Sequence, residues 1–264
     1  MQKTKSKIKK TFVYQFESII HIESSDDNLI LDFSEDYLSK SIDFILNSSS
    51  DLVELIYFNS HPSIVPSLYF DNNIKSKYLI TNTVSAKTIL SDTSNDKKIK
   101  VVYSISYNLI DLLNKSNLEH SYNNYFTYLY NFLIDKVLKP KGLSFFVNLN
   151  NKSFDIIIFN NNEFIFFNSF KINDENEFLY YLFFVLKNYE GSNKTDKVIF
   201  LGKFEKFKDY YDIASKYSVI DFIQDDNSSI IIHDSPFFSI INYIFKGLVW
   251  GCWCYAITLY KSKF

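Results

Sequence analysis

The sequence predicts an α/β protein made of two similarly built halves, each with a mixed five-stranded sheet flanked by helices. Two observations predict this class. Short apolar and aromatic runs alternate with longer segments whose apolar residues recur at helical spacing, and the order found in the second half recurs more faintly in the first. With 264 residues, 47% of them hydrophobic, the chain is long enough to bury two cores of ordinary size.

The second half has the clearer pattern. Three runs rich in Ile and Phe, at residues 143–150, 153–160 and 163–170, are separated by two or three polar residues. This spacing predicts an antiparallel meander joined by hairpins. Both connections are rich in asparagine, the commonest non-glycine residue at positive φ, so both are expected to form tight primed turns.

A helix is expected to follow the meander. Asp174 and Glu177 have the spacing of a capping box, and apolar residues then recur at helical spacing until Gly191 ends the helix. The remaining elements are a strand, a helix and a strand, at 197–202, 204–217 and 219–223. This order is the ribonuclease-H-like plan, in which a meander continues into parallel strands through right-handed helical crossovers.

The first half repeats the plan with weaker signals. Its meander is expected at residues 18–24, 28–34 and 37–44, and its later strands at 52–58 and 99–106. Helices are expected at 107–115 and at 122–137, the latter linking the halves. Two such halves in tandem form the actin-like ATPase fold.

Four segments are therefore expected along the chain. Residues 1–16 are interpreted as a flexible basic N-terminus. The first half covers 17–139 and contains a polar insertion at about 60–98, and the second half covers 140–245. Residues 246–264 are an apolar C-terminal tail.

Composition argues against several classes of function. A net charge of −2 disfavours a nucleic-acid-binding protein, and all 28 basic residues are lysine, so no arginine clamp can grip a phosphate or carboxylate. Two cysteines, at 252 and 254, give no disulfide framework, and no signal peptide is expected, so we expect a cytoplasmic protein.

Acidic and histidine residues give no clear metal site. The acidic residues near the first hairpins are Asp26, Asp27, Asp32, Glu35 and Asp36. They can be interpreted as a two-metal carboxylate site, as in ribonuclease-H-like nucleases, or as solvated turn residues, which we favour. The histidines, at 21, 61, 120 and 233, lie far apart in the sequence. No metal and no cofactor are expected.

Two segments carry a resemblance to a known family. Their residues are Val65, Pro66 and Phe70 in the first, and Asn168, Phe170 and Asp174 to Tyr181 in the second. With them, roughly residues 18–245 resemble domain of unknown function 3822, a family of bacterial proteins. The resemblance implies a fold shared with the actin-like ATPases, and it implies no activity.

The resemblance also identifies the segment where a phosphate site is expected. Working actin-like ATPases hold phosphates between two hairpins, one per half, of the form Asp-x-Gly followed by small residues and Thr. Here Asn148 replaces the metal-side aspartate. The three glycines are replaced by Asn150, Asn151 and Lys152, whereas Ser153 and Asp155 remain. Side chains then fill the phosphate space, and Mg²⁺ loses a carboxylate partner.

The other nucleotide motifs also depart from the pattern. The first-half hairpin is expected at 22–28, which contains no glycine and three acidic side chains. After the fourth strand of the second half, Gly202 and Lys203 replace the Gly-Gly that cradles adenosine.

These departures predict a pseudo-ATPase, a non-catalytic interaction or scaffold module whose partner is an unknown protein. One alternative is an ATPase or kinase with an unorthodox phosphate site that uses Lys152 and Ser153. A second alternative is a tail-anchored membrane protein, because residues 237–260 carry one charge, Lys246, and are long enough to span a bilayer.

Overall fold

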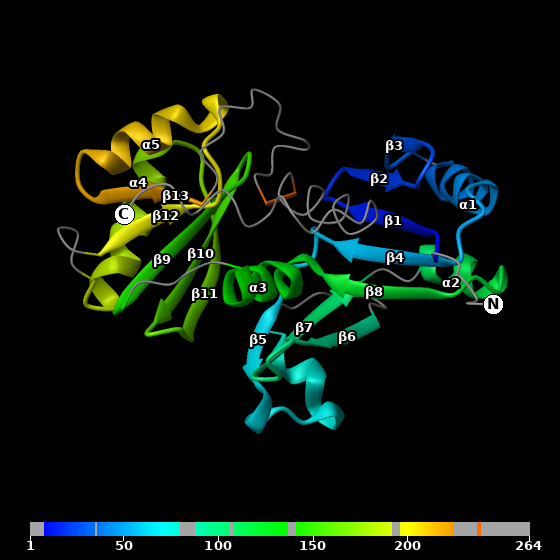
Figure 1. Ribbon diagram of the computed structural model, residues 1–264, viewed down its shortest axis with the longest axis horizontal. Helices are drawn as coiled ribbons and strands as arrows, with labels where there is room; N and C mark the ends of the chain where they lie inside the picture. The colour runs from blue at the N-terminus through cyan, green and yellow to red at the C-terminus, as the bar shows by residue number, and fades with distance from the viewer. Residues whose placement is uncertain are drawn as a thin grey trace, which may run out of the picture. The chain divides into compact units, whose positions relative to one another are not determined.

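The computed structural model describes residues 8–34, 36–79, 88–105, 108–136, 141–191, 196–223 and 237–238 (Figure 1). The chain divides into two compact units, residues 1–133 and 134–264.

Sheet A of the first unit has five strands in the order β3-β2-β1-β4-β8. The strands are β1 (Lys10–Gln15), β2 (Ile19–Glu23), β3 (Asn28–Asp32), β4 (Leu52–Tyr57) and β8 (His120–Asn124). β1, β2 and β3 pair antiparallel, whereas β4 runs parallel to β1 and β8 parallel to β4. This is the mixed five-stranded sheet of the ribonuclease-H-like plan.

Three helices belong to this plan: α1 (Tyr37–Asn47), α2 (Asn108–Lys115) and α3 (Tyr125–Lys136). α1 crosses from β3 to β4 and contacts α2. α3 follows β8 directly, and Asn124 caps it, because the Asn124 side-chain oxygen accepts a hydrogen bond from the Phe126 backbone N–H at 2.9 Å.

The insertion forms a separate three-stranded sheet B in the order β5-β7-β6 (Figure 1). Its strands are β5 (Ser63–Pro66), β6 (Thr88–Thr93) and β7 (Ile99–Ile105). Two 3-10 helices, η1 (Ser67–Tyr69) and η2 (Asn72–Tyr78), follow β5. The insertion therefore extends to Ile105, beyond its predicted end at residue 98.

Sheet C of the second unit repeats the order of sheet A, as β11-β10-β9-β12-β13. The strands are β9 (Leu143–Leu149), β10 (Ser153–Asn160), β11 (Glu163–Lys171), β12 (Lys197–Phe200) and β13 (Val219–Phe222). The helical elements are α4 (Glu175–Asn188), the 3-10 helix η3 (Glu205–Phe207) and α5 (Lys208–Ser215). The predicted α/β class and the repeated plan are confirmed.

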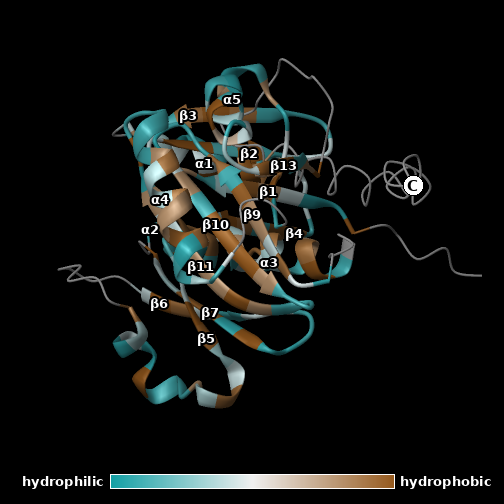
Figure 2. Cartoon of the chain, turned by 90° about the vertical axis from the view of Figure 1, so that its left-hand side faces the viewer, coloured by the Kyte–Doolittle hydropathy of each residue, from teal (hydrophilic) through white to brown (hydrophobic). Residues whose placement is uncertain are grey.

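The core of the second unit lies between α4, α5 and one face of sheet C, whose central strands are largely apolar (Figure 2). Asp174 begins α4 because its Oδ1 accepts hydrogen bonds from the backbone N–H groups of Asn176 and Glu177, both at 2.9 Å. The reciprocal half of the predicted capping box is shifted by one residue: the Glu177 carboxylate accepts from the backbone N–H of Asn173 at 2.9 Å.

Three predictions about the first half are wrong. Residues 10–15 are not part of a flexible terminus but form the central strand of sheet A. Residues 37–44 are helical rather than a strand, because Leu38, Ile42 and Ile45 recur at helical spacing and Ile45 is buried. The strand at 99–105 pairs within sheet B, and β8 takes its expected place in the five-stranded sheet.

The two asparagine turns differ. Asn161 and Asn162 have φ values of 48° and 69°, so the β10–β11 connection is the primed turn that was predicted. In the β9–β10 connection, none of residues 150–152 has a positive φ, so the same prediction is wrong there. The β9–β10 connection therefore does not need asparagine to reach a positive φ.

Candidate functional site

The hairpins β1–β2 and β9–β10 occupy equivalent places in the two sheets, since each joins the central strand to its antiparallel neighbour. Their loops close in the same way. The Phe16 N–H donates to the Ile19 carbonyl at 2.9 Å, and the Asn150 N–H donates to the Ser153 carbonyl at 2.8 Å. The two loops can therefore be compared residue by residue.

This comparison places the first-half counterpart of the phosphate hairpin at the β1–β2 connection. Residues 22–28, predicted to be that hairpin, end β2, turn and begin β3, because the sequence prediction missed β1 and shifted the strand count by one. The position of Asn148 in the second hairpin corresponds to Tyr14, and the position of Asp155 to His21, since each pair lies directly across its ladder. The metal-side position in the first unit thus holds a tyrosine.

In the second hairpin, Asn148 and Asp155 form a buried pair. The Asn148 Nδ2 donates to the Asp155 Oδ2 at 2.9 Å, and the two residues are 1% and 2% exposed. Both share a sheet face with Phe146 and Ile157, which are fully buried. The Asn148 Oδ1 is also buried and accepts no hydrogen bond within the described residues. The pair thus has one carboxyl group where two aspartates would have two.

The loop residues of this hairpin lie closer to solvent. Asn151 and Lys152 are exposed, and Asn150 and Ser153 are half-buried. The Lys152 carbonyl accepts from the backbone N–H of Ile172 at 3.0 Å, which fixes the loop to the end of β11. The structure therefore brings all six predicted hairpin residues together, but only the side chains of Asn148 and Asp155 have a hydrogen bond to each other.

The first hairpin is aromatic. Tyr14 is fully buried, its ring centroid lies 5.7 Å from that of His21, and burial raises its pKa well above the usual value, with further contributions from Glu23 and Glu54. The Phe16 ring stacks on Phe58 at a centroid distance of 4.7 Å. A buried neutral phenol cannot replace the carboxylate of an Asp-x-Gly motif.

The sequence signal for this hairpin is the run Thr11 to Tyr14, all four of which are buried. The lysine-rich residues before it conceal the run, because a basic stretch at a chain start resembles a solvated terminus. The equivalence of Tyr14 with Asn148 follows from the register of the paired strands, and that register cannot be read from the sequence.

β12 ends at Phe200, two residues before the predicted end of this strand, and Gly202 and Lys203 follow after Leu201. A Cβ on Gly202 would lie 2.4 Å from Cε2 of the buried Phe204 ring, so this glycine makes room for the chain's own aromatic side chain. The Tyr211 hydroxyl donates to the Gly202 carbonyl at 2.9 Å, and the Lys203 ammonium lies 5.4 Å from the centre of the Phe222 ring. A cavity of about 260 Å³ adjoins this turn.

Other predicted candidates do not converge. Within the described ranges no group of three or more His, Cys, Asp or Glu side chains is placed to hold a metal. Asp36 pairs with Lys40 at 2.6 Å, and the His120 Nδ1 lies 2.9 Å from the Leu118 carbonyl oxygen. Glu35, His233 and both cysteines lie outside the described residues.

The C-terminal tail also lies outside the described residues, and of residues 237–260 only Phe237 and Phe238 are described, both fully buried. Among the helices of the described segments, none combines the length and the apolar character that crossing a bilayer requires.

A buried carboxylate in the insertion was missed by the sequence reasoning. Asp92 on β6 accepts hydrogen bonds from the Tyr103 hydroxyl at 2.8 Å, the Asn124 N–H at 2.7 Å and the Thr127 hydroxyl at 2.7 Å. Burial raises its pKa, and the three hydrogen bonds oppose this shift. Asp92 ties sheet B to the start of α3, and we assign it a structural role.

Comparison with known proteins identifies a family and a fold. The family described as "Protein of unknown function (DUF3822)" matches residues 42–219, which is more than half of the chain but less than the predicted 18–245. A protein from Bacteroides thetaiotaomicron, described as having an actin-like ATPase fold and unknown function, superposes with a TM-score of 0.70 and 14% identity, covering 84% of this chain and 93% of that one.

More distant structures include the PilM-PilN type IV pilus biogenesis complex, with a TM-score of 0.47 and 7% identity over 80% of this chain and 87% of that one. The ethanolamine utilization protein EutJ from Carboxydothermus hydrogenoformans has a TM-score of 0.42 and 8% identity, covering 81% of this chain and 84% of that one. No curated protein matches the sequence.

Proposed function

The chain belongs to the DUF3822 family of proteins of unknown function and has an actin-like ATPase fold, and from these premises we propose that it is a non-catalytic relative of the actin-like ATPases. In this proposal it is a cytoplasmic interaction or scaffold module that has lost nucleotide binding.

One observation carries the proposal: both positions for a metal-side carboxylate hold other residues. These positions are Tyr14 in the β1–β2 hairpin and Asn148 in the β9–β10 hairpin, and both side chains are buried. Mg²⁺ is a hard cation that binds through carboxylates together with phosphate oxygens. With a phenol and an amide there, the metal-side position of each hairpin lacks a charged ligand.

The loops support the same conclusion. Neither contains a glycine, and the exposed residues at the first tip are Glu17 and Ser18, of which Glu17 has a carboxylate that would repel a phosphate. Close approach of backbone N–H groups to phosphate oxygens needs small residues, whereas Phe16 and Asn150 carry side chains at the first glycine position.

The test is thermal unfolding of the full chain with millimolar ATP, with and without Mg²⁺. A ligand that binds only the folded state adds RT ln(1 + [L]/Kd), about 2.7 kcal/mol at a hundredfold excess over Kd. Each kcal/mol added to the free energy of unfolding raises the melting temperature by roughly 2–4 °C for a domain of about 150–250 residues. We expect no magnesium-dependent shift.

A clear shift would overturn the proposal, and two variants then locate the site. Lys152→Ala and Ser153→Ala change groups near the surface of the second hairpin, where an unorthodox phosphate site would lie. If they abolished the shift, the chain would be an ATPase or kinase that uses these groups. If they left it unchanged, nucleotide would bind elsewhere.

The cytoplasmic part of the proposal has its own test. Expressed full-length chain and a version ending at Phe245 are separated into soluble and membrane fractions. We expect both in the soluble fraction. A full chain that stays with membranes, beside a soluble shortened chain, would instead establish the tail-anchored alternative.

A further inference from the structure

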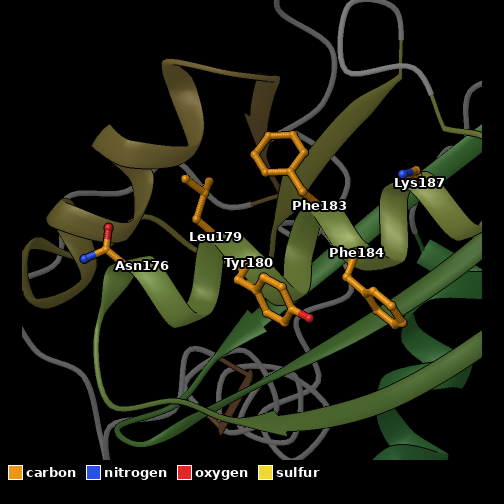
Figure 3. A pocket seen from close by; sticks show the side chains of 6 residues that line it. All are labelled: Asn176, Leu179, Tyr180, Phe183, Phe184 and Lys187. Carbon is orange, nitrogen blue, oxygen red and sulfur yellow. The ribbon is translucent and has the colours of Figure 1, made fainter.

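Helix α4 carries further apolar side chains outside its buried side; Tyr180 and Phe184 are exposed, and Phe183 is half-buried against the core. Its buried side carries Phe178, Leu182, Val185 and Leu186. On the other side, Leu179, Tyr180, Phe183 and Phe184 line an open hollow of about 470 Å³ (Figure 3). Tyr180 is 65% exposed and Phe184 is 52% exposed. We call this surface, with Asn176 and Lys187, the outer face of α4.

Ring contacts hold the aromatic side chains of the outer face in place. Tyr180 and Phe184, one turn apart, stack with a centroid distance of 6.4 Å and an interplanar angle of 20°. Phe183 meets Tyr217 edge to face at 6.0 Å, and Tyr217 is itself 54% exposed. A contiguous exposed apolar surface of this kind typically marks an interaction site.

The two ends of the outer face differ in polarity. Asn176 lies at the start of the helix and Lys187 at its end, with the apolar residues between them (Figure 3). Glu175 and Glu177 make the first turn acidic, and Lys187 makes the last turn basic. Acidic N-terminal and basic C-terminal turns complement each other when two such helices run antiparallel.

We infer that the outer face of α4 is a self-association surface, on which two copies pack α4 against α4 antiparallel about a two-fold axis. The axis passes between Tyr180 and Phe183, near the middle of the face. Each Lys187 then lies beside Asn176 and the acidic first turn of the other copy, and this contact occurs twice because the interface is isologous. The aromatic residues pack on their own equivalents.

Charge selects this occupant over others. A parallel pair would place Lys187 beside Lys187 and join like ends of the helix dipoles. An anionic lipid surface attracts clusters of basic residues, whereas this face has one lysine and is flanked by Glu175 and Glu177. The acidic first turn and the basic last turn of α4 are complementary in charge, so a second copy of the helix supplies the matching charges.

The experiment is sedimentation velocity on the full chain over a range of concentrations, with circular dichroism to verify folding. We expect a concentration-dependent monomer–dimer equilibrium in the wild type. Lys187→Glu and Asn176→Lys each place like charges together twice, so each raises the dimer Kd by about tenfold or more. Both side chains are exposed, so folding should be preserved.

The decisive arm mixes the two variants. In the mixed pair, the glutamate introduced by Lys187→Glu in one copy faces the lysine introduced by Asn176→Lys in the other, and the second contact stays as in the wild type. We expect the equimolar mixture, and likewise the double variant Asn176→Lys/Lys187→Glu, to recover wild-type dimerisation. Lys171→Glu, an equal charge change on an exposed strand end, is the matched control and should leave Kd unchanged.

Several outcomes would overturn the inference. A wild type that is monomeric at all concentrations would do so, as would a dimer that is insensitive to Lys187→Glu. A mixture no more associated than either variant alone would exclude the antiparallel arrangement. Binding of the monomeric wild type to anionic vesicles that Phe184→Asp abolishes would assign the face to a membrane. None of these readouts depends on nucleotide.

Discussion

The side-chain amide of Asn148 donates a hydrogen bond to the carboxylate of buried Asp155, with Nδ2 and Oδ2 2.9 Å apart. These residues are directly opposite each other on β9 and β10. An aspartate at 148 would place two carboxylates at this distance without a metal between them. The amide instead supplies a hydrogen-bond donor to the Asp155 carboxyl group, so these two side chains need no cation between them.

Changing Asn148 to Asp should therefore destabilise the fold. The variant loses the donor and buries a second acid, and we expect the free energy of unfolding at pH 8 to fall by about 1–3 kcal/mol. One of two adjacent buried carboxyls has its pKa raised in the folded state, so the folded chain binds that proton more tightly than the unfolded chain. The loss should consequently shrink as the pH falls to 5.

Urea denaturation at the two pH values measures this effect. Asn151→Asp is the control, because it makes the same change at an exposed loop residue and should alter the free energy by no more than about 0.5 kcal/mol. Equal losses in the two variants would show that the Asn148–Asp155 contact has no special role.

The two asparagine turns give a second prediction. Asn162 has a φ of 69°, which β-branched residues avoid, so Asn162→Val should lower the free energy of unfolding by about 1–2 kcal/mol. Asn162→Gly should be tolerated. Asn151→Val should be almost neutral, because Asn151 has no positive φ. Thermal melts of the three variants test this order, and a neutral Asn162→Val would contradict it.

How much could be predicted from sequence depends on how strongly each segment is patterned. The runs that became β9, β10 and β11 are rich in Ile and Phe and are bounded by polar turns, so their limits were predicted within a residue or two. β1 follows a lysine-rich stretch that resembles a solvated terminus. In α1 the apolar residues Ile42, Phe44 and Leu46 also alternate as they would in a strand, so the local pattern does not distinguish the two structures. Residues 10–15 form a strand because they pair with β2 on one side and β4 on the other.

The candidate site shows the same limit. The pairing of Asn148 with Asp155 could be anticipated, because residues equally distant from a hairpin turn lie opposite each other. The roles of Tyr14 and His21 could not, since they depend on β1 being recognised as a strand. Asp92 and its partners on β7, β8 and α3 are far apart in sequence, and only the tertiary structure brings them together.

Asp92 carries a prediction about pH. Because burial raises its pKa, the folded chain holds the Asp92 proton more tightly than the unfolded chain does. The free energy of unfolding should therefore decrease as the pH rises from about 4, the usual carboxyl value, through the folded pKa, and then level off. Asp92→Asn should remove this contribution to the slope.

Two substitutions separate the charge of Asp92 from its hydrogen bonds. An asparagine can still accept from the Asn124 N–H and the Thr127 hydroxyl if the Tyr103 hydroxyl turns to accept, so Asp92→Asn should cost under about 1.5 kcal/mol at neutral pH. Asp92→Ala leaves the buried Asn124 N–H unpaired and should cost about 2–4 kcal/mol. Urea titrations from pH 4 to 7 measure both, and equal costs would contradict the assignment.

Gly202 gives the last prediction, which concerns why a glycine follows β12. A Cβ there would lie 2.4 Å from Cε2 of the Phe204 ring, and Phe204 is only 3% exposed, so the ring has little room to move. Gly202→Ala should therefore overpack this turn and lower the free energy of unfolding by about 1–3 kcal/mol.

A double-mutant cycle identifies the ring as the cause. Phe204→Leu removes the ring atom that the new Cβ would meet, so Gly202→Ala should cost measurably less in the Phe204→Leu background than in the wild type. Gly142→Ala is the contrasting case: nothing lies within 4 Å of its Cβ, and its φ of +85° makes backbone strain the only penalty, which Phe204→Leu should not relieve. If the cost of Gly202→Ala were the same in both backgrounds, the glycine would be required for a reason other than Phe204.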